Sequence, residues 1–234
     1  MNSLVTSPVF GVLISLVAYL IGEFLKEKTK LSIFNPLLIS IIILISFLLK
    51  FNIKYTDYNK GGQLISFFLS PATVALALPF YKKFSLFKKN ALPIIIGILC
   101  GAASGIIYII LFSRLFNFSD ALTESLLPKS ITTPIGMELS RQLGGIPAIT
   151  VVSIIITGIL GTIVGPFLYK LLKFKDKVAM GIAMGACSHA VGTAKAMEIG
   201  ETEGAMSSLT MALSGIITVF LAPLIWHLFL MLTK

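Results

Sequence analysis

Five stretches of the chain carry no charged residue and are long enough to cross a lipid bilayer. They cover residues 5–22, 31–49, 91–112, 146–169 and 204–226. A helix needs about 20 apolar residues to span the hydrocarbon core. Only 12% of the 234 residues are charged, whereas a typical soluble domain has roughly 25%. Too few charges are therefore present to coat a water-facing surface, and the sequence predicts an all-α polytopic membrane protein.

The charged residues indicate no nucleic-acid partner, although the formal net charge is +9. The lysines collect in short segments between the apolar runs, where such residues usually fix the orientation of a membrane protein. Cys100 and Cys187 each lie alone inside a hydrophobic segment, so the sequence indicates no disulfide framework, metal site or other cofactor. The first lysine is Lys26, so the N-terminal run lacks the basic region of a cleavable signal peptide. We therefore expect it to be a retained span.

Three further segments, 61–81, 126–144 and 178–198, are interrupted by Pro, Gly or clustered hydroxyl residues. Two of them contain a hydroxyl residue followed by Pro, which is a typical start of a helix. Irregular backbone survives at membrane depth only when it is buried in protein or lines a wet cavity. We therefore expect these interrupted segments to be broken or re-entrant helices that meet at one place. They bring the prediction to about six to eight membrane segments.

Residues 1–234 are expected to form a single transmembrane domain. A weak correspondence at an offset of half the chain predicts two repeat halves, 1–117 and 118–234, an organisation common among secondary transporters. The alternative to a duplication is that short apolar stretches of the two halves match by chance. If 61–81 crosses fully and 126–144 re-enters, most lysines lie on the cytoplasmic side. If 61–81 and 178–198 are opposed hairpins, the repeat becomes inverted and the charge bias nearly vanishes.

The interrupted segments contain the polar residues from which an anion site can be built. The N-terminal end of a broken helix carries free N–H groups and a partial positive charge, which suit a carboxylate. The candidate binding residues add hydroxyl, cationic or small side chains; they are Thr73, Lys129, Ser130, Thr132, Thr133, Ser188, His189, Gly192, Thr193 and Lys195. His189 also titrates near neutral pH and, with Glu138 or Glu198, is a candidate to carry a coupled proton.

Each of these residues has a structural alternative. A hydroxyl in a membrane helix often bonds the carbonyl four residues earlier in its own helix. Lys129, Lys195 and Arg141 can extend from segment ends to the membrane surface, and His189 can be a packed, hydrogen-bonded histidine. Glycines four residues apart predict close helix packing; they are Gly97, Gly101 and Gly105, Gly161 and Gly165, and Gly181 and Gly185. The tyrosines near segment ends and Trp226 predict an aromatic belt at the membrane surface.

The pattern does not indicate an enzyme. Ser188 and His189 are adjacent, and adjacent residues of a helix point about 100° apart, so adjacency alone does not make them a nucleophile and base. The chain also lacks the HExxH motif of metal-assisted hydrolysis.

Three blocks of the sequence resemble the signature blocks of the LrgB/CidB family. They read SPATVALALPFYKK at 70–83, LPKSITTPIGMELSRQLGG at 127–145 and GACSHAVGTAKAMEIGETEGAMSS at 185–208. The resemblance extends over essentially the whole chain. It implies two functions. Bacterial members are named antiholin-like or holin-like modulators of murein hydrolase export and lysis, and are often encoded beside a small LrgA/CidA-type membrane protein. The related plant plastid protein carries glycolate and glycerate, and some bacterial relatives are linked to pyruvate uptake.

The interrupted segments favour the carrier. A holin needs only oligomerising hydrophobic helices, whereas a carboxylate carrier needs helix ends, hydroxyls and a cation around one anion. We therefore predict a secondary transporter of small carboxylates, such as glycolate, glycerate or pyruvate, that works by proton-coupled alternating access. The alternative is an antiholin-like or holin-like modulator acting with an LrgA/CidA-type partner. Either would be a multi-pass protein of the bacterial plasma membrane, and the glycine-rich faces suggest a homo-oligomer such as a dimer.

Overall fold

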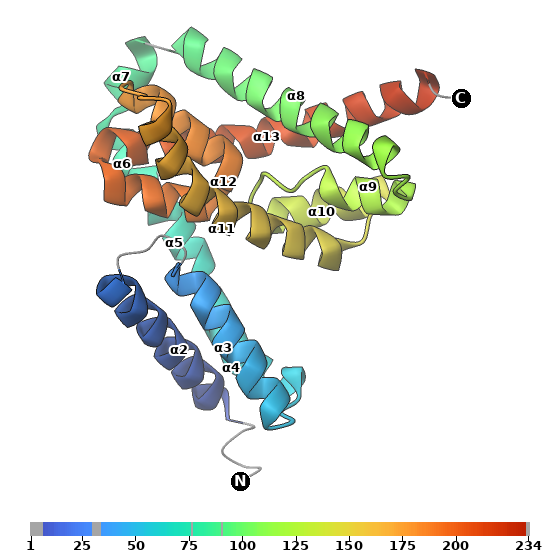
Figure 1. Cartoon of the computed structure of the whole chain (residues 1–234). Helices are drawn as coiled ribbons and strands as arrows, with labels where there is room; N and C mark the ends of the chain where they lie inside the picture. The colour runs from blue at the N-terminus through green and yellow to red at the C-terminus, as the bar shows by residue number, and fades with distance from the viewer. Residues whose placement is uncertain (1–6, 30–33, 76, 90, 233–234) are drawn as a thin grey trace. The chain divides into compact units, whose positions relative to one another are not determined.

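The computed structural model describes residues 7–29, 34–75, 77–89 and 91–232. Within these ranges every regular element is a helix and no strand occurs (Figure 1). The all-α prediction is therefore confirmed. The chain divides into two compact units, 1–75 and 76–234. The repeat halves 1–117 and 118–234 stay a prediction.

The first unit is a group of helices, two of which make close contact through glycines. Its elements are α2 (Pro8–Thr29), α3 (Pro36–Lys50), α4 (Tyr55–Phe67) and α5 (Leu69–Ala75). Gly11 of α2 and Gly61 of α4 bring the two backbones into direct contact, and neither has room for a side chain. Asn35 begins α3 by accepting a hydrogen bond from the N–H of Leu37 at 2.9 Å, as an N-cap residue does.

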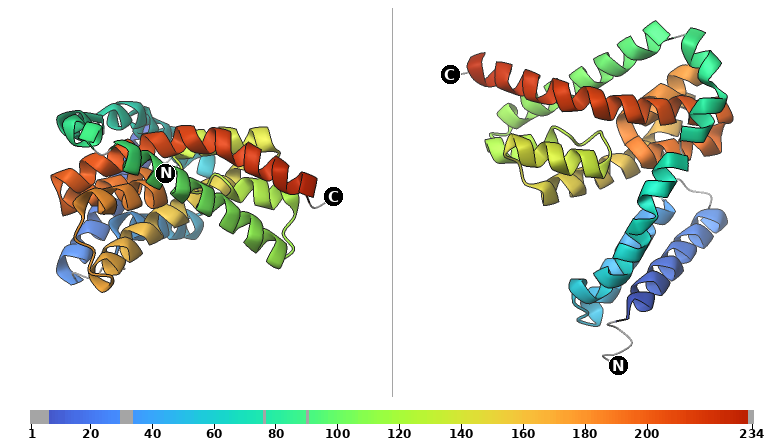
Figure 2. Two further views of the ribbon diagram at one scale, coloured as in Figure 1. Left: turned by 90° about the horizontal axis from the view of Figure 1, so that it is seen from above. Right: turned by 180° about the vertical axis from the view of Figure 1, so that it is seen from behind.

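The second unit contains the remaining helices, arranged around the pair α12 and α13 (Figure 2). Its elements are α6 (Ala77–Lys82), α7 (Phe84–Lys89), α8 (Ala91–Leu115), α9 (Asp120–Leu126), α10 (Thr133–Leu143), α11 (Pro147–Leu171), α12 (Lys177–Ile199) and α13 (Glu201–Leu232). Helix α12 packs along both α13 and α11, and α13 also contacts α8 and α6. The short α10 lies against α11. The interrupted segments 126–144 and 178–198 thus belong to the same unit.

Within the described part of the chain, four helices are long and apolar enough to cross a membrane: α2, α8, α11 and α13. Helix α3 is apolar but has only 15 residues. The other candidate segments are divided. Segment 61–81 is split between α4, α5 and α6, and segment 126–144 between a turn and α10. Helix α12 is interrupted at His189. The prediction of full-length spans mixed with broken helices agrees with this arrangement.

Two apolar clusters join α8 to α13. Ile94 and Ile98 of α8 pack with Met206 near the start of α13. Farther along, Ile106 and Ile109 pack with Trp226 and with residues of the α9–α10 region. The two long helices therefore pack against each other at two separate places, and residues 99–105 of α8 lie between these places.

The glycine patterns have two different outcomes. Gly181 and Gly185 of α12 confirm the packing prediction, because a side chain at either position would meet the backbone of α13 at Glu203 or Ser207. Such small residues let helix backbones approach closely in a membrane. Helix α8 shows no such contact within the described chain. Among the described residues, Gly97 and Gly105 have no neighbouring atom within 4 Å of an added Cβ, and Gly101 has only Ala186, at 3.9 Å. These glycines leave space within the chain, and their packing at a subunit interface stays a prediction.

Trp226 is also not the membrane-surface residue that its position near a segment end predicted. Its side chain is 2% exposed and lies in the apolar cluster with Ile131 and Leu139. The indole Nε1 donates a hydrogen bond of 2.9 Å to Oε1 of Glu124 in α9. A buried indole needs such an acceptor, and this pair fixes α9 against α13.

Replacing Gly185 tests the close contact between α12 and α13. Gly185→Ala should lower the stability of the detergent-solubilised protein by about 1–3 kcal/mol, because the added methyl group overpacks the interface. Gly97→Ala is the matched control. It should be neutral or stabilising by up to about 1 kcal/mol, because Ala favours a helix over Gly. Thermal unfolding of the two variants measures the difference, and equal effects would contradict the packing.

Candidate functional site

The backbone of α12 breaks at His189. This residue has φ 41° and ψ −130°, whereas the rest of α12 is helical. A positive φ is unfavourable for a residue with a Cβ and persists only where the surroundings enforce it. The break divides the helix into 177–188 and 190–199. Strain of this kind is typical of functional positions.

Helix α11 holds the His189 ring in place. Its Nε2 lies 3.0 Å from the carbonyl oxygen of Ile154. Because a carbonyl can only accept, Nε2 carries the proton in this hydrogen bond. Gly158 of α11 lies directly opposite the ring, and a Cβ at that position would come within 2.9 Å of His189 Cε1. A glycine is therefore required where the ring enters the α11 surface.

Ser188 is fully buried, and its Oγ has no hydrogen-bond partner within the described part of the chain. The hydroxyl faces Gly161 of α11, where an added Cβ would overlap it. A buried hydroxyl without a partner costs about 1–3 kcal/mol. Ser188 therefore departs from the structural alternative, in which a hydroxyl bonds its own helix.

Thr193 links the second half of α12 to α13. Its side chain is fully buried, and its Oγ1 donates a 2.8 Å hydrogen bond to the carbonyl of His189. The same oxygen lies 2.9 Å from Oγ of Ser207. Thr193 thus bonds its own helix, as the alternative predicted, and also bridges to α13. Gly192, beside it, leaves room for the carbonyl of Met184, which lies only 2.5 Å from an added Cβ because of the break.

Lys129 differs from the other candidate cations because no acidic side chain among the described residues pairs with it. It lies in the turn between α9 and α10 and is partly buried. Ser130, the next residue, and Ala186, near the break of α12, line the same small cavity. Lys195 is paired with Glu198 at 2.6 Å. Glu198 therefore compensates the charge of Lys195, whereas no acidic side chain among the described residues compensates the charge of Lys129.

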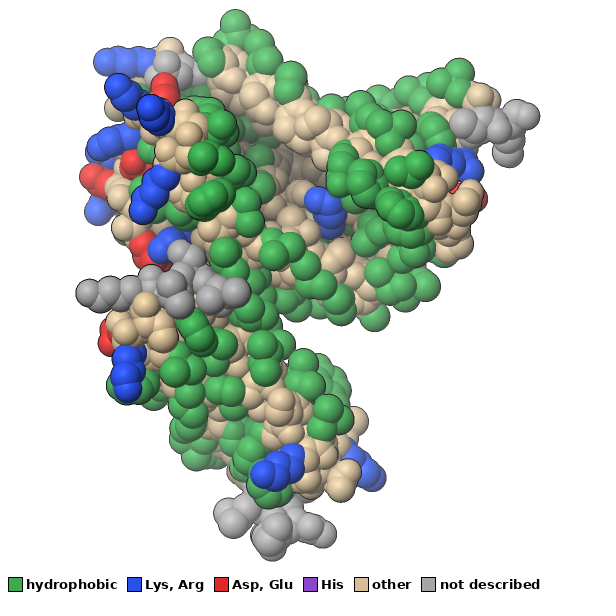
Figure 3. Space-filling view, in the orientation of Figure 1, with side chains coloured by type: hydrophobic (Ala, Val, Ile, Leu, Met, Phe, Trp, Pro, Cys, Tyr) green, Lys and Arg blue, Asp and Glu red, His purple; other side chains and the backbone are tan. Residues whose placement is uncertain are grey.

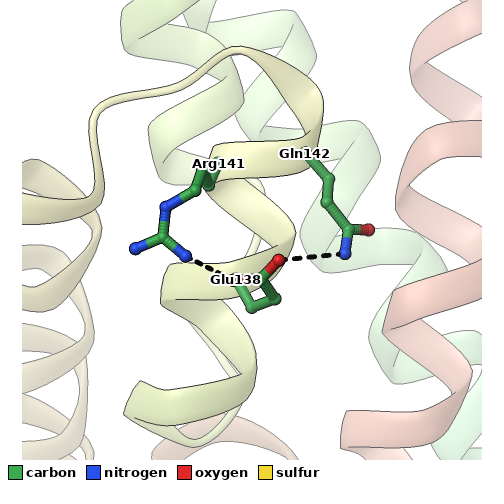
Figure 4. Close-up of polar contacts among 3 residues, drawn as sticks. All are labelled: Glu138, Arg141 and Gln142. Carbon is green, nitrogen blue, oxygen red and sulfur yellow. Dashed lines mark hydrogen bonds and ion pairs between the residues drawn. The ribbon is translucent and has the colours of Figure 1, made fainter.

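Arg141 and Glu138 form an ion pair on the exposed face of α10. Gln142 also donates to Glu138, with 3.2 Å between Nε2 and Oε1 (Figure 4). Glu138 and Glu198 are thus each paired with a cation one turn away in the same helix.

The remaining candidates lie at the beginning of α10, in the turn before it and in the short helix α5. Thr132 is the N-cap residue of α10, although its side chain makes no capping bond, and Thr133 is the first residue of that helix. Ser130 lies in the same turn as Lys129 and lines a small cavity. Thr73 belongs to α5 of the first unit, and its side chain lies outside the described residues.

The sequence reasoning missed the hydroxyl residues of α13. Ser207, Ser214 and Thr218 are all buried and recur at helical spacing along one face of that helix. Glu124, which accepts the Trp226 hydrogen bond, was also missed. The absence of charge in residues 204–226 predicts a membrane span but says nothing about the hydroxyl residues within it. The signal that could have found these residues is the separation of Ser207, Ser214 and Thr218 by seven and then four positions, which places them on one face of a helix.

Long apolar helices combined with a broken polar helix define an all-α, multi-pass membrane protein. The chain matches the LrgB-like family over residues 15–228 and belongs to that family. It is 39% identical to the uncharacterized protein YxaC of Bacillus subtilis (strain 168), over 93% of this chain and 95% of that one. It is 37% identical to the antiholin-like protein LrgB of the same organism, over 93% and 94%.

A further relative, the antiholin-like protein LrgB of Bacillus cereus (strain B4264), is 36% identical over 93% of this chain and 95% of that protein. No solved structure matches the chain. The family prediction is thus confirmed, and with it a bacterial multi-pass membrane protein. The names of these relatives favour the antiholin-like alternative over the carrier.

Two substitutions at the break test its backbone strain. His189→Ala and His189→Gly both lose the ring, but Gly adopts a positive φ without the penalty of a Cβ. We expect the Gly variant to be more stable than the Ala variant by about 1 kcal/mol in thermal unfolding. At the helical neighbour the order should reverse, so Ala190→Gly should be destabilising by about 0.5–1 kcal/mol. A more stable Ala variant at position 189 would mean that the residue is helical.

Proposed function

We propose that the chain is a carrier of small carboxylates whose site lies at the break of α12. One observation carries the proposal: a partly buried lysine without an acidic partner lies beside a broken helix with buried hydroxyls. An ionised side chain at membrane depth is costly and is usually paired. Lys129 has no such partner among the described side chains. The carboxylate of a transported acid would supply the missing charge.

The hydroxyls around the break fit the same ligand. Ser188 Oγ is buried and unpartnered among the described residues, so it can donate a hydrogen bond to a carboxylate oxygen without breaking an existing one. The second half of α12 begins at the break, and the first N–H groups of a helix attract anions. In the proposed site, a cation, a hydroxyl and a helix beginning would together hold the carboxylate. A holin-like protein, which makes a nonselective lesion in the membrane, needs none of these groups.

His189 is the residue that we assign to proton coupling. Its Nε2 proton is engaged with Ile154, so a second proton would enter at Nδ1 and place a positive charge at the break. Movement of 190–199 against 177–188 about this residue would expose the site to alternate sides of the membrane, as broken helices do in other carriers. Glu138 and Glu198 are weaker candidates, because each is already paired with a cation.

Uptake by proteoliposomes that contain only this chain tests the proposal. Lys129→Met should reduce uptake of radiolabelled glycolate or pyruvate about tenfold or more, the effect of losing one charged hydrogen bond. Lys195→Met removes the same charge from an existing pair and is the matched control, with an expected loss of no more than about twofold. Saturable uptake by wild type that is insensitive to Lys129→Met would contradict the assigned site, and absence of uptake would contradict the carrier.

The second candidate is the antiholin-like function, which the names of the relatives favour. In that case the chain would modulate murein hydrolase export and lysis together with an LrgA/CidA-type membrane protein. Substitution of Lys129 or Ser188 would then matter little as long as the helices remain membrane-soluble. Reconstitution with such a partner distinguishes the two: release of an entrapped dye supports the lysis-related function, whereas selective acid uptake without dye release supports the carrier.

A further inference from the structure

A small cavity lies in the second unit between α8, the α9–α10 turn, α12 and α13. Its volume open to a water molecule is about 20 Å³, and one water needs roughly 10–15 Å³. This face of the unit is hollowed in Figure 3, with a Lys or Arg side chain inside the hollow. The polar side chains of the cavity wall are Ser130, Ser214 and Thr218, and the other lining residues include Gly101 and Gly105.

The glycines of α8 create this space. The two apolar clusters hold α8 against α13 on either side of the interval that contains Gly101 and Gly105. Neither glycine has an atom closer than 3.9 Å to an added Cβ. Bare backbone therefore forms the wall that faces Ser214 and Thr218. Larger residues would fill the interval.

Ser214 is the polar group that the cavity leaves unsatisfied. It is 4% exposed, and its Oγ has no hydrogen-bond partner within the described ranges. One turn earlier in α13, Thr210 donates to the carbonyl of Met206 at 2.8 Å. A buried hydroxyl that makes no such bond is unfavourable unless another molecule satisfies it. Ser214 therefore lies beside a space of the right size for one oxygen-bearing group.

The cavity is adjacent to the proposed carboxylate site. Ser130 follows Lys129 directly in the chain, and Ala186, which also lines the cavity, directly precedes Cys187. The turn that carries Lys129 and the part of α12 just before the break therefore border the same cavity. We place the carbon next to a carboxylate bound at Lys129 near Ser130 and the mouth of this cavity.

We propose that this cavity is a specificity subsite, in which Ser214 donates a hydrogen bond to an oxygen on the carbon next to the carboxylate. The proposal rests on the proposed carrier function. The subsite selects acids that bear a hydroxyl or carbonyl oxygen over acids of the same size with a methyl group. Its small volume excludes longer substituents. Ser130 and Thr218 complete the polar lining.

Glycolate and propionate test this subsite because they differ by a hydroxyl in place of a methyl group. Competition of each acid against radiolabelled glycolate is measured on the purified full-length protein. Wild type should prefer glycolate. Ser214→Ala should weaken glycolate binding about three- to tenfold, the effect of one neutral hydrogen bond, and leave propionate unchanged. The variant should fold normally, because removing an unpartnered buried hydroxyl is close to neutral.

Two matched controls accompany this variant. Ser113→Ala removes another buried, unpartnered hydroxyl of the described residues, on α8 but outside the cavity lining, and should change neither affinity. Gly105→Ala places a methyl group in the cavity and should weaken glycolate binding. Gly97→Ala adds the same group about one helical turn before the first lining residue of α8, Gly101, and should not weaken it.

An equal loss for both acids in Ser214→Ala, or no loss for either, would overturn the subsite while leaving the carrier intact. If wild type binds neither acid, the carrier function fails and the subsite fails with it.

Discussion

The candidate site depends on how the protein supplies hydrogen-bond partners to the backbone at the break of α12. Lipid offers no hydrogen bonds, so the groups released at the break must find partners inside the protein. The His189 ring bonds the Ile154 carbonyl, and Thr193 bonds the His189 carbonyl and approaches Ser207. Gly158 and the other glycines that face α12 remove the side chains that would obstruct this arrangement.

The same arrangement leaves a small set of groups without hydrogen-bond or ionic partners among the described residues, and in our proposal these groups bind the ligand. Ser188 and Ser214 are buried hydroxyls without partners within the described chain, and Lys129 lacks an acidic neighbour there. A protein that needed only stability would pair or replace such groups. Their retention in one unit, near the break and the cavity, is the physical reason for proposing a small anionic ligand.

Much of the fold followed from the sequence, because the absence of charge and the interruptions are local features. The break fell within the polar cluster around His189, as expected. What could not be predicted depends on what each residue faces. Spacing alone gave Gly97 and Gly181 the same role, yet one borders open space and the other touches α13. The pair of Lys195 with Glu198, three residues later, is a local pattern that the sequence already contains. That Lys129 has no acidic partner among the described residues depends on the fold.

The most direct test asks whether water reaches the break inside the membrane. Cys187, beside the break, and Cys100, on α8, are both exposed on the surface of the protein. A difference in their labelling therefore reports whether each thiol borders water or lipid. A charged thiol reagent reacts with thiolate in water and not in lipid. In proteoliposomes we predict labelling of wild type and of Cys100→Ser, but not of Cys187→Ser. Protection of Cys187 with labelling of Cys100 would contradict a water-accessible site at the break of α12.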